Sequence, residues 1–430
     1  MRKYKLGDIA TVEISGVDKK IKDGEEDIRL CNFVDVYYNW AITMARHDSF
    51  MLATARPNEI SKFQLKKGQV ALTKDSETRD DIGISTYIAD DFNDVILGYH
   101  CALITPNKDI LDGRYLNALM HTGYAKKYFA FNASGSGQRY ALSVEALNSF
   151  PVPRIPLREQ QRIGEIFSAL DKKIELNRRI NQNLEAMAKQ LYNYWFVQFD
   201  FPNEEGKPYK SSGGKMVWNE KLKREIPFGW HCGNLFEIAV FTNGLACQKF
   251  RPKDDEASLP VIKIREMHDG ISADTEKVTP NIPESVKVYN GDVLFSWSAS
   301  LEVMLWAYGL GGLNQHIFKV TSANDFPKSF FYFQLLDYVD VFKKMAEARK
   351  TTMGHITQDH LQQSAIAIPD NKDIADRFEE LISPIFNQII KLHEEILNLT
   401  KQRDKLLPLL MNGQVSVNSD LSVYKEKMRG

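Results

Sequence analysis

The fold is decided by residues 163–195, IGEIFSALDKKIELNRRINQNLEAMAKQLYNYW, and by a second stretch at residues 378–410, FEELISPIFNQIIKLHEEILNLTKQRDKLLPLL. In both stretches, mostly apolar residues recur at alternating spacings of four and three. This alternation is typical of a coiled-coil seam, because it keeps one stripe of a helix facing a partner helix. The predicted seam positions are Ile163, Phe167, Leu170, Ile174, Asn177, Asn181, Leu184, Ala188, Leu191 and Trp195, and then Phe378, Ile382, Ile385, Ile389, Leu392, Ile396, Leu399, Arg403, Leu406 and Leu410.

The two stretches are copies at a constant separation. Positions 163 and 378, and likewise 195 and 410, are 215 residues apart. Each predicted helix also follows a segment of similar size with the composition of a globular domain. We therefore infer a duplicated protein with pseudo-two-fold symmetry, an architecture that suits a target with two halves.

The globular segments repeat each other more loosely. Their matching pieces lie 214 to 229 residues apart, as insertions in divergent copies would produce. The matches are Leu6-Gly-Asp-Ile-Ala with Leu235-Phe-Glu-Ile-Ala, Lys67-Gly-Gln-Val-Ala-Leu with Asn290-Gly-Asp-Val-Leu-Phe, Tyr99-His-Cys-Ala-Leu-Ile with Gln315-His-Ile-Phe-Lys-Val, and Ser143-Val-Glu-Ala-Leu with Thr357-Gln-Asp-His-Leu. A shared framework with unlike loops is how one fold recognises two different targets.

Composition limits the class of protein. The chain has 430 residues, 43% of them hydrophobic and 26% charged, which is typical of globular domains. We find no apolar run of about 18 residues and no signal peptide, and the four cysteines are far apart, so we expect a cytoplasmic protein with free thiols. The net charge of −1 is unusual for a protein that binds nucleic acid alone, so any such binding would use local patches and partner proteins.

The predicted class is α+β, with two mixed α/β domains separated by two long helices. Strands are expected near 94–98 and 101–105, one helix at 113–131, and extended chain at the proline-rich residues 151–156. The expected segments are a first domain at 1–156, the central helix at 157–200, a loop-like connector at 201–228, a second domain at 229–369, a C-terminal helix at 370–412 with Asn412-Gly413 as its C-cap, and a tail at 413–430.

Three polar residues and one proline interrupt the helical pattern. Asn177 and Asn181 occupy seam positions of the first helix and Arg403 occupies one of the second. A buried asparagine fixes register at a cost in stability; the alternative is that this stretch is partly exposed. Pro384 predicts a kink or break near Ser383.

Motifs for catalysis are missing from the sequence. We find no phosphate-binding glycine loop, no Asn/Asp-Pro-Pro-Tyr string of amino-methyltransferases, and no zinc or serine-hydrolase motif. His100 and His316 occupy matching positions, but a matched framework position favours a core role over catalysis. The chain is therefore expected to carry no catalytic, metal or cofactor site.

Candidate nucleic-acid contacts lie in the loops. Glutamine pairs with adenine and arginine with guanine in the major groove, while hydroxyls and backbone N–H groups suit phosphate. The alternative is that these are ordinary solvated loops. The candidates are Lys74, Arg79, Ser134, Ser136, Gln138, Arg139 and Tyr140 in the first domain, and Ser296, Trp297, Ser298, Arg349, Lys350, Thr351, Thr352 and His355 in the second.

Several motifs around the first long helix resemble one family. They are Ile155-Pro-Leu-Arg-Glu-Gln-Gln-Arg-Ile, Ala169-Leu-Asp-Lys-Lys-Ile, Asn193-Tyr-Trp-Phe-Val-Gln-Phe-Asp-Phe, Lys207-Pro-Tyr-Lys-Ser-Ser-Gly-Gly-Lys-Met-Val and Glu225-Ile-Pro-Phe-Gly-Trp. Over essentially its whole length the chain resembles the specificity (S) subunit of type I restriction-modification enzymes. It departs from the family's pattern at the second helix, which begins Asp370-Asn-Lys-Asp without the Leu-x-Glu-Gln motif.

The resemblance implies a non-catalytic chain that binds double-stranded DNA. Each domain would recognise one half of a bipartite, asymmetric site, and the long helices would pack antiparallel as a spacer. Two methyltransferase subunits, which bind S-adenosylmethionine, and motor-nuclease subunits, which bind ATP and magnesium, would join it. The alternatives are a duplicated coiled-coil scaffold without DNA binding, and a methyltransferase with a fused recognition domain, whose cofactor and catalytic motifs are missing from the sequence.

Overall fold

The computed structural model describes residues 2–135, 139–253, 256–298, 300–348, 356 and 358–411. The chain forms two compact units, Met1–Glu175 with Leu399–Gly430, and Leu176–Asn398. Two long helices contribute to both units: α7 (Leu157–Tyr192) and α12 (Asp373–Met411). The predicted α+β class, with two β-rich domains and two long helices packed together, is confirmed.

The first unit is built on a five-stranded sheet in the order β2-β10-β6-β8-β4, with a second sheet in the order β5-β3-β9. Its strands are β1 (Lys3–Lys5), β2 (Ala10–Ile14), β3 (Glu26–Cys31), β4 (Ala41–Ile42), β5 (Met51–Ala55), β6 (Val70–Thr73), β7 (Asp75–Ser76), β8 (Ser85–Ile88), β9 (Val95–Leu97), β10 (Cys101–Pro106), β11 (Ser134–Gly135), β12 (Tyr140–Ala141) and β13 (Pro151–Pro153). Its helices are α1 (Leu6–Ile9), α2 (Phe33–Tyr38), α3 (Pro57–Phe63), α4 (Gly113–Met120), α5 (Gly123–Asn132) and α6 (Val144–Asn148).

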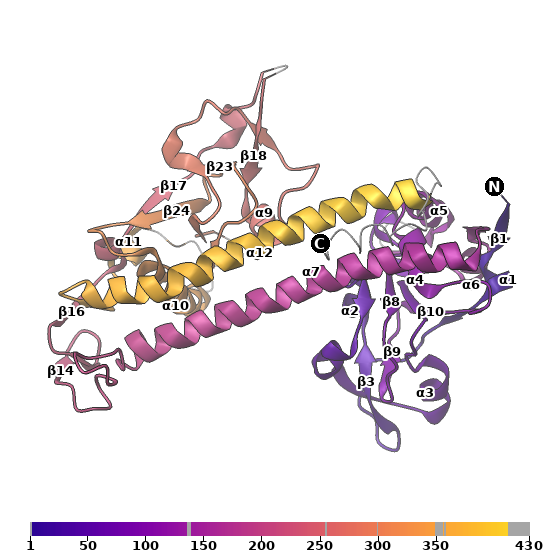
Figure 1. Cartoon of the computed structure of the whole chain (residues 1–430), viewed down its shortest axis with the longest axis horizontal. Coiled ribbons are helices and arrows are strands. Elements are labelled where there is room, and N and C mark those ends of the chain that lie inside the picture. Colours follow the sequence, from indigo (N-terminus) through magenta and orange to yellow (C-terminus); the bar gives the residue numbers. More distant parts are fainter. Residues whose placement is uncertain are drawn as a thin grey trace, which may run out of the picture. The chain divides into compact units, whose positions relative to one another are not determined.

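The second unit has a sheet in the order β17-β24-β21-β22 and another in the order β19-β18-β23-β20. Figure 1 shows β17 and β24 as neighbours, paired antiparallel. Its strands are β14 (Met216–Asn219), β15 (Arg224–Pro227), β16 (Trp230–Gly233), β17 (Ala239–Asn243), β18 (Leu259–Ile262), β19 (Lys277–Val278), β20 (Lys287–Val288), β21 (Val293–Ser296), β22 (Glu302–Leu305), β23 (Gly311–Leu313), β24 (Ile317–Ser322) and β25 (Ile366–Pro369). Its helices are α8 (Leu235–Ile238), α9 (Ile264–Asp269), α10 (Lys328–Ala348) and α11 (Gln358–Gln362).

The two units share one topology, which confirms the duplication. The order β2-β10-β6-β8 of the first corresponds to β17-β24-β21-β22 of the second. A one-turn helix precedes β2 and another precedes β17. Gly68 (φ 98°) and Gly291 (φ 89°) precede β6 and β21 in the left-handed region that favours glycine. The motifs that matched in the sequence therefore occupy matching places in the fold.

Helices α7 and α12 pack antiparallel through the predicted seams. Asn177 Nδ2 donates to Glu395 Oε2 at 2.9 Å, and Asn181 Nδ2 donates to the carbonyl oxygen of Ile389 at 3.3 Å. As the contacts move toward the C-terminus of α7, their partners move toward the N-terminus of α12, so the two helices run antiparallel. Both asparagines are at most 3% exposed, so the alternative of a partly exposed stretch is wrong.

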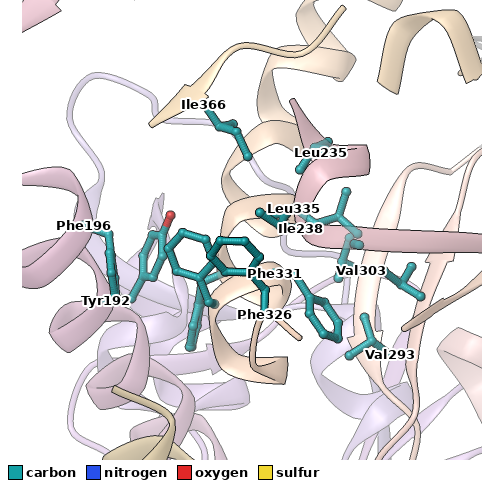
Figure 2. Close-up of a cluster of buried hydrophobic side chains, with 14 of the residues drawn as sticks. Tyr192, Phe196, Leu235, Ile238, Val293, Val303, Phe326, Phe331, Leu335 and Ile366 are labelled. Carbon is teal, nitrogen blue, oxygen red and sulfur yellow. The ribbon is translucent and has the colours of Figure 1, made fainter. Parts of the chain in front are cut away.

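Each unit has its own core against these helices. In the first, Phe167 of α7 and Leu410 of α12 join the side chains of β6, β10, α4 and α5. In the second, Tyr192 stacks on Phe333 of α10 with ring centroids 5.1 Å apart. Figure 2 shows Tyr192 and the neighbouring Phe196 on one side of this cluster, which extends to Leu235 and Ile238 of α8 and Val293 of β21.

Two local predictions are wrong. The expected helix at 113–131 is two helices, α4 and α5, because the Thr122 side chain accepts a hydrogen bond from the Ala125 N–H and caps a new helix. The expected break near Ser383 does not occur, since α12 is continuous there. Pro384 lies on the exposed face of α12, where water can bond the Glu380 carbonyl that the proline leaves unpaired.

The connector holds structure that the sequence pattern did not reveal. Strands β14 and β15 form an antiparallel hairpin between residues 216 and 227. The rings of Phe201 and Trp230 stack with centroids 5.6 Å apart, which anchors both ends of this segment to the core of the second unit. The predicted C-cap at Asn412-Gly413 and the tail lie outside the described residues.

Candidate nucleic-acid interface

In the first unit, the structure brings two candidate segments together. Strand β12 lies between β11 and β7, so that Tyr140 pairs with Ser76 on one side and with Gly135 on the other. The Arg79 guanidinium lies over the Tyr140 ring, 5.0 Å from its centroid. Residues 74–79 therefore form one surface with residues 134–135 and 139–140, which are far away in the sequence, and this surface includes Ser134. The candidates Ser136 and Gln138 lie outside the described residues.

Asp75 is the centre of the charged groups on this surface. Its carboxylate accepts hydrogen bonds from Lys74 Nζ, which lies 2.9 Å from both oxygens, and from His100 Nδ1. The guanidinium of Arg139 lies 3.8 Å away. Burial alone would raise the pKa of Asp75, but the hydrogen bonds from Lys74 and His100 outweigh burial and lower that pKa. Asp75 therefore stays an anion that fixes three basic groups in place.

A groove of about 790 Å³ lies beside these residues. Helix α2 contributes Phe33, Tyr37 and Tyr38 to its lining, which also includes Arg139 and His100. Tyr38 is 74% exposed. Burial, followed by a hydrogen bond to Asp81, raises the pKa of Tyr37 to about 12, so its hydroxyl remains a donor at neutral pH. Aromatic faces, hydrogen-bond donors and a guanidinium are thus gathered in one open groove.

The second unit places different side chains at the matching position. After β21, the Trp297 N–H donates to the His316 carbonyl at 3.3 Å, just as the Lys74 N–H after β6 donates to the His100 carbonyl at 2.9 Å. On the other side, the Ile356 N–H donates to the Trp297 carbonyl at 3.0 Å. In the first unit, the matching bond joins the Leu142 N–H to the Lys74 carbonyl at 2.8 Å. The two copies therefore share a backbone arrangement that carries a histidine in both, but Lys74 in the first and Trp297 in the second.

Trp297 is the part-exposed candidate at this second position. Its Nε1 donates to Asn243 Oδ1 at 3.2 Å, and its ring lies 5.6 Å from that of His316. Ser296 is fully buried, and its hydroxyl bonds within the turn to the carbonyl of Ser300 and the N–H of Glu302, so we leave it out of the interface. Ser298 is 7% exposed. Arg349, Lys350, Thr351, Thr352 and His355 lie outside the described residues.

Comparison with known families decides the identity. A family model described as "Type I restriction modification DNA specificity domain" matches residues 1–186 and 227–400. The chain belongs to this family. As a type I specificity chain, it is the non-catalytic DNA specificity subunit of a type I restriction enzyme complex.

Individual relatives agree with this assignment. The specificity chain is 27% identical over 320 residues to the type I restriction enzyme MjaIX specificity subunit of Methanocaldococcus jannaschii, covering 72% of this chain and 71% of that one. It is 24% identical over 411 residues to the HindI specificity subunit of Haemophilus influenzae, covering 83% and 88%. In fold it is similar to the S subunit crystal structure from M. genitalium, with a TM-score of 0.56, 13% identity and 95% coverage of each chain.

The sequence analysis did not single out Asp75 within the candidate segment 74–79 of this specificity chain, and it favoured a core role for His100. His100 is in fact part-exposed and lines the groove, next to Arg139. One feature of the sequence could have indicated this role of His100. Matched histidines precede the matched strands β10 and β24, and in the fold these strands begin close to where β6 and β21 end. Strand ends that meet at one sheet edge bring such residues together, whatever their separation in the sequence.

Other kinds of site were also considered. Within the described ranges, we find no group of three or more His, Cys, Asp or Glu side chains arranged to hold a metal ion. All four cysteines are free, and Cys31, Cys101 and Cys247 are buried, which raises the pKa of each thiol. No helix in the described part of the chain has the length and hydropathy needed to cross a bilayer.

Proposed function

We propose that each unit of this specificity subunit recognises one half of a bipartite, asymmetric site in double-stranded DNA. The observation that carries the proposal is the shared backbone arrangement after β6 and β21. It holds Lys74 in one copy and Trp297 in the other, next to a histidine in both. In the first copy, that histidine also contacts Arg139. Equal frameworks with unlike side chains suit two half-sites of unlike sequence.

The chemistry of the first surface suits base recognition. Arginine forms paired hydrogen bonds with guanine in the major groove, and lysine neutralises phosphate. Arg139 is 59% exposed, so it can reach a ligand, whereas Lys74 is mostly covered and faces Asp75. Arg139 is therefore the base-reading candidate, and the exposed aromatic Tyr38 offers apolar contact at the rim of the groove.

Partner subunits would supply the catalytic activities and part of the positive charge that this chain lacks. We propose that it assembles with two methyltransferase subunits, which bind S-adenosylmethionine, and with motor-nuclease subunits, which bind ATP and magnesium. The net charge of −1 supports this, because partner subunits would add the positive charge that tight DNA binding needs. The antiparallel pair α7–α12 would set the spacing between half-sites.

An exchange of recognition domains tests the proposal. Residues 1–156 are replaced by the equivalent domain of a relative, and methylated adenines are mapped by sequencing the host genome. We expect one half of the methylated motif to change and the other to remain. A change in both halves, or in neither, would show that the two-reader model is wrong, and an unmethylated genome would favour a scaffold without DNA recognition.

A further inference from the structure

Arg139 is held by a relay of side chains rather than standing free. Its Nη2 lies 2.7 Å from Nδ1 and 2.9 Å from Nε2 of His100. The same imidazole bonds through Nδ1 to Asp75, whose side chain is 9% exposed. A part-exposed imidazole thus lies between a mostly buried carboxylate and an exposed guanidinium.

The chemistry of the ring allows one arrangement of protons. A carboxylate can only accept, so Nδ1 must carry the hydrogen that bonds to Asp75. A guanidinium can only donate, so Arg139 needs a lone pair, and in neutral His100 only Nε2 offers one. Asp75 therefore selects the tautomer in which Nε2, 2.9 Å from Nη2, is the ring nitrogen that can accept from Arg139, while the nearer Nδ1 is only in contact with the guanidinium.

We propose that Asp75 and His100 are positioning residues that orient Arg139 to recognise one base pair of the half-site bound by the first unit. The inference rests on the proposed function. It adds the residue that distinguishes the base pair, Arg139, and the two residues that orient its side chain, Asp75 and His100. An arginine fixed by a rigid support loses little conformational entropy when it pairs with guanine. A guanine, whose N7 and O6 accept the paired donors, is the base that it fits.

The test uses the full-length chain assembled with its methyltransferase subunits, and a library of randomised DNA duplexes as the probe. Selection with the wild-type complex first defines the preferred base at each position. Arg139→Ala is expected to lower discrimination about tenfold at one position of one half-site, leaving the others unchanged. Arg56→Ala is the control, because Arg56 is an exposed arginine of the same unit that pairs with Glu59 outside the groove.

Two variants of His100 isolate the relay. His100 has φ 69°, a backbone region that asparagine tolerates well. The shorter amide of His100→Asn reaches only the position of Nδ1, where it can donate to Asp75, and leaves no acceptor at the position of Nε2 for Arg139. We expect it to relax the same position as Arg139→Ala. The longer amide of His100→Gln can place an oxygen near the position of Nε2, where it accepts from Arg139, so this variant should keep discrimination at that position. Thermal unfolding followed by circular dichroism checks that each variant folds.

Each other outcome is informative. If Arg139→Ala weakens binding evenly across all sequences, Arg139 contacts phosphate and the proposal is overturned. If Arg139→Ala relaxes one position but His100→Asn does not, the positioning role is overturned while base recognition by Arg139 stands. If the wild-type complex selects no sequence at all, the proposed function itself fails, a result distinct from either.

Discussion

The guanidinium of Arg403 lies over the indole ring of Trp40, 5.0 Å from its centroid. Trp40 also stacks on His121 at 4.3 Å and touches Phe167 of α7 at 6.0 Å. Arg403 was the polar exception in the predicted seam of the second helix. Its place is explained by an aromatic face of the first unit, which a guanidinium covers better than an aliphatic side chain does.

The first prediction concerns this contact. Arg403→Ala should lower the free energy of unfolding of the first unit by about 1 kcal/mol, because a partly buried cation–π contact contributes about 0.5–2 kcal/mol. Native-state hydrogen exchange at the amides of β10 reports this unit alone. Lys401→Ala, at an exposed position of the same helix, is the control and should leave exchange unchanged. Equal effects of the two substitutions would mean that the stacking adds nothing to stability.

The second prediction concerns pH. Burial, helped by the charge of Arg403, lowers the pKa of His121 from 6.5 to about 4. Between these values the unfolded chain binds the proton and the folded chain does not, so stability falls as pH falls. From pH 7 to pH 5 the wild type should lose about 2 kcal/mol more than His121→Gln does, measured by the same exchange experiment. Parallel pH profiles for the two proteins would contradict this.

The third prediction concerns the two seam asparagines. Asn177 and Asn181 each have a buried Oδ1 that finds no hydrogen-bond partner among the described residues, a cost of about 1–3 kcal/mol per atom. Replacing both by leucine should therefore raise the melting temperature. If the asparagines fix register, the same variant should also self-associate through alternative pairings, which light scattering detects. Ile174→Leu, an apolar exchange in the same seam, is the control, and a more stable variant that stays monomeric would refute the register role.

The sequence predicted what depends on local periodicity. Alternating spacings of apolar residues fix which helix face is buried, so the seams around Asn177 and Arg403 and the duplication could be inferred without coordinates. The relay could not, because His100 lies 25 residues from Asp75 and 39 from Arg139, and only strand pairing brings them together. Capping by Thr122 was missed for another reason: the apolar pattern continues across that helix break.

The fourth prediction concerns the second unit. Trp297→Ala should lower affinity for the cognate site about tenfold and relax only the half-site that Arg139→Ala leaves intact, because loss of recognition at one base pair costs about 1–3 kcal/mol. Selection from the randomised duplex library measures both effects. Trp218 is 55% exposed on the β14–β15 hairpin, so Trp218→Ala is the control and should keep the selected sequence. Relaxation of both half-sites by Trp297→Ala would contradict separate recognition.

The fifth prediction concerns the helices as a spacer. Four residues add about 6 Å to a helix, which is close to two base pairs at about 3.4 Å each. Four residues are also slightly more than one turn, so the apolar stripe stays nearly in phase. Asn177 contacts Glu395, and the helices run antiparallel. An insertion after Asn177 in α7 must therefore be matched by an insertion on the N-terminal side of Glu395 in α12. The seam contacts on both sides of the paired insertions then keep their partners.

We expect the doubly lengthened chain to support methylation of the same two half-sites at a spacing longer by about two base pairs, as sequencing of the methylated genome would show. An insertion in α7 alone is the control. It moves Asn181 one turn away from the Ile389 carbonyl while Asn177 keeps Glu395, so the seam is mismatched on one side and methylation should fall. If the double insertion is active with its original spacing, the helices serve only to hold partner subunits, and the docking of each domain on DNA sets the distance instead.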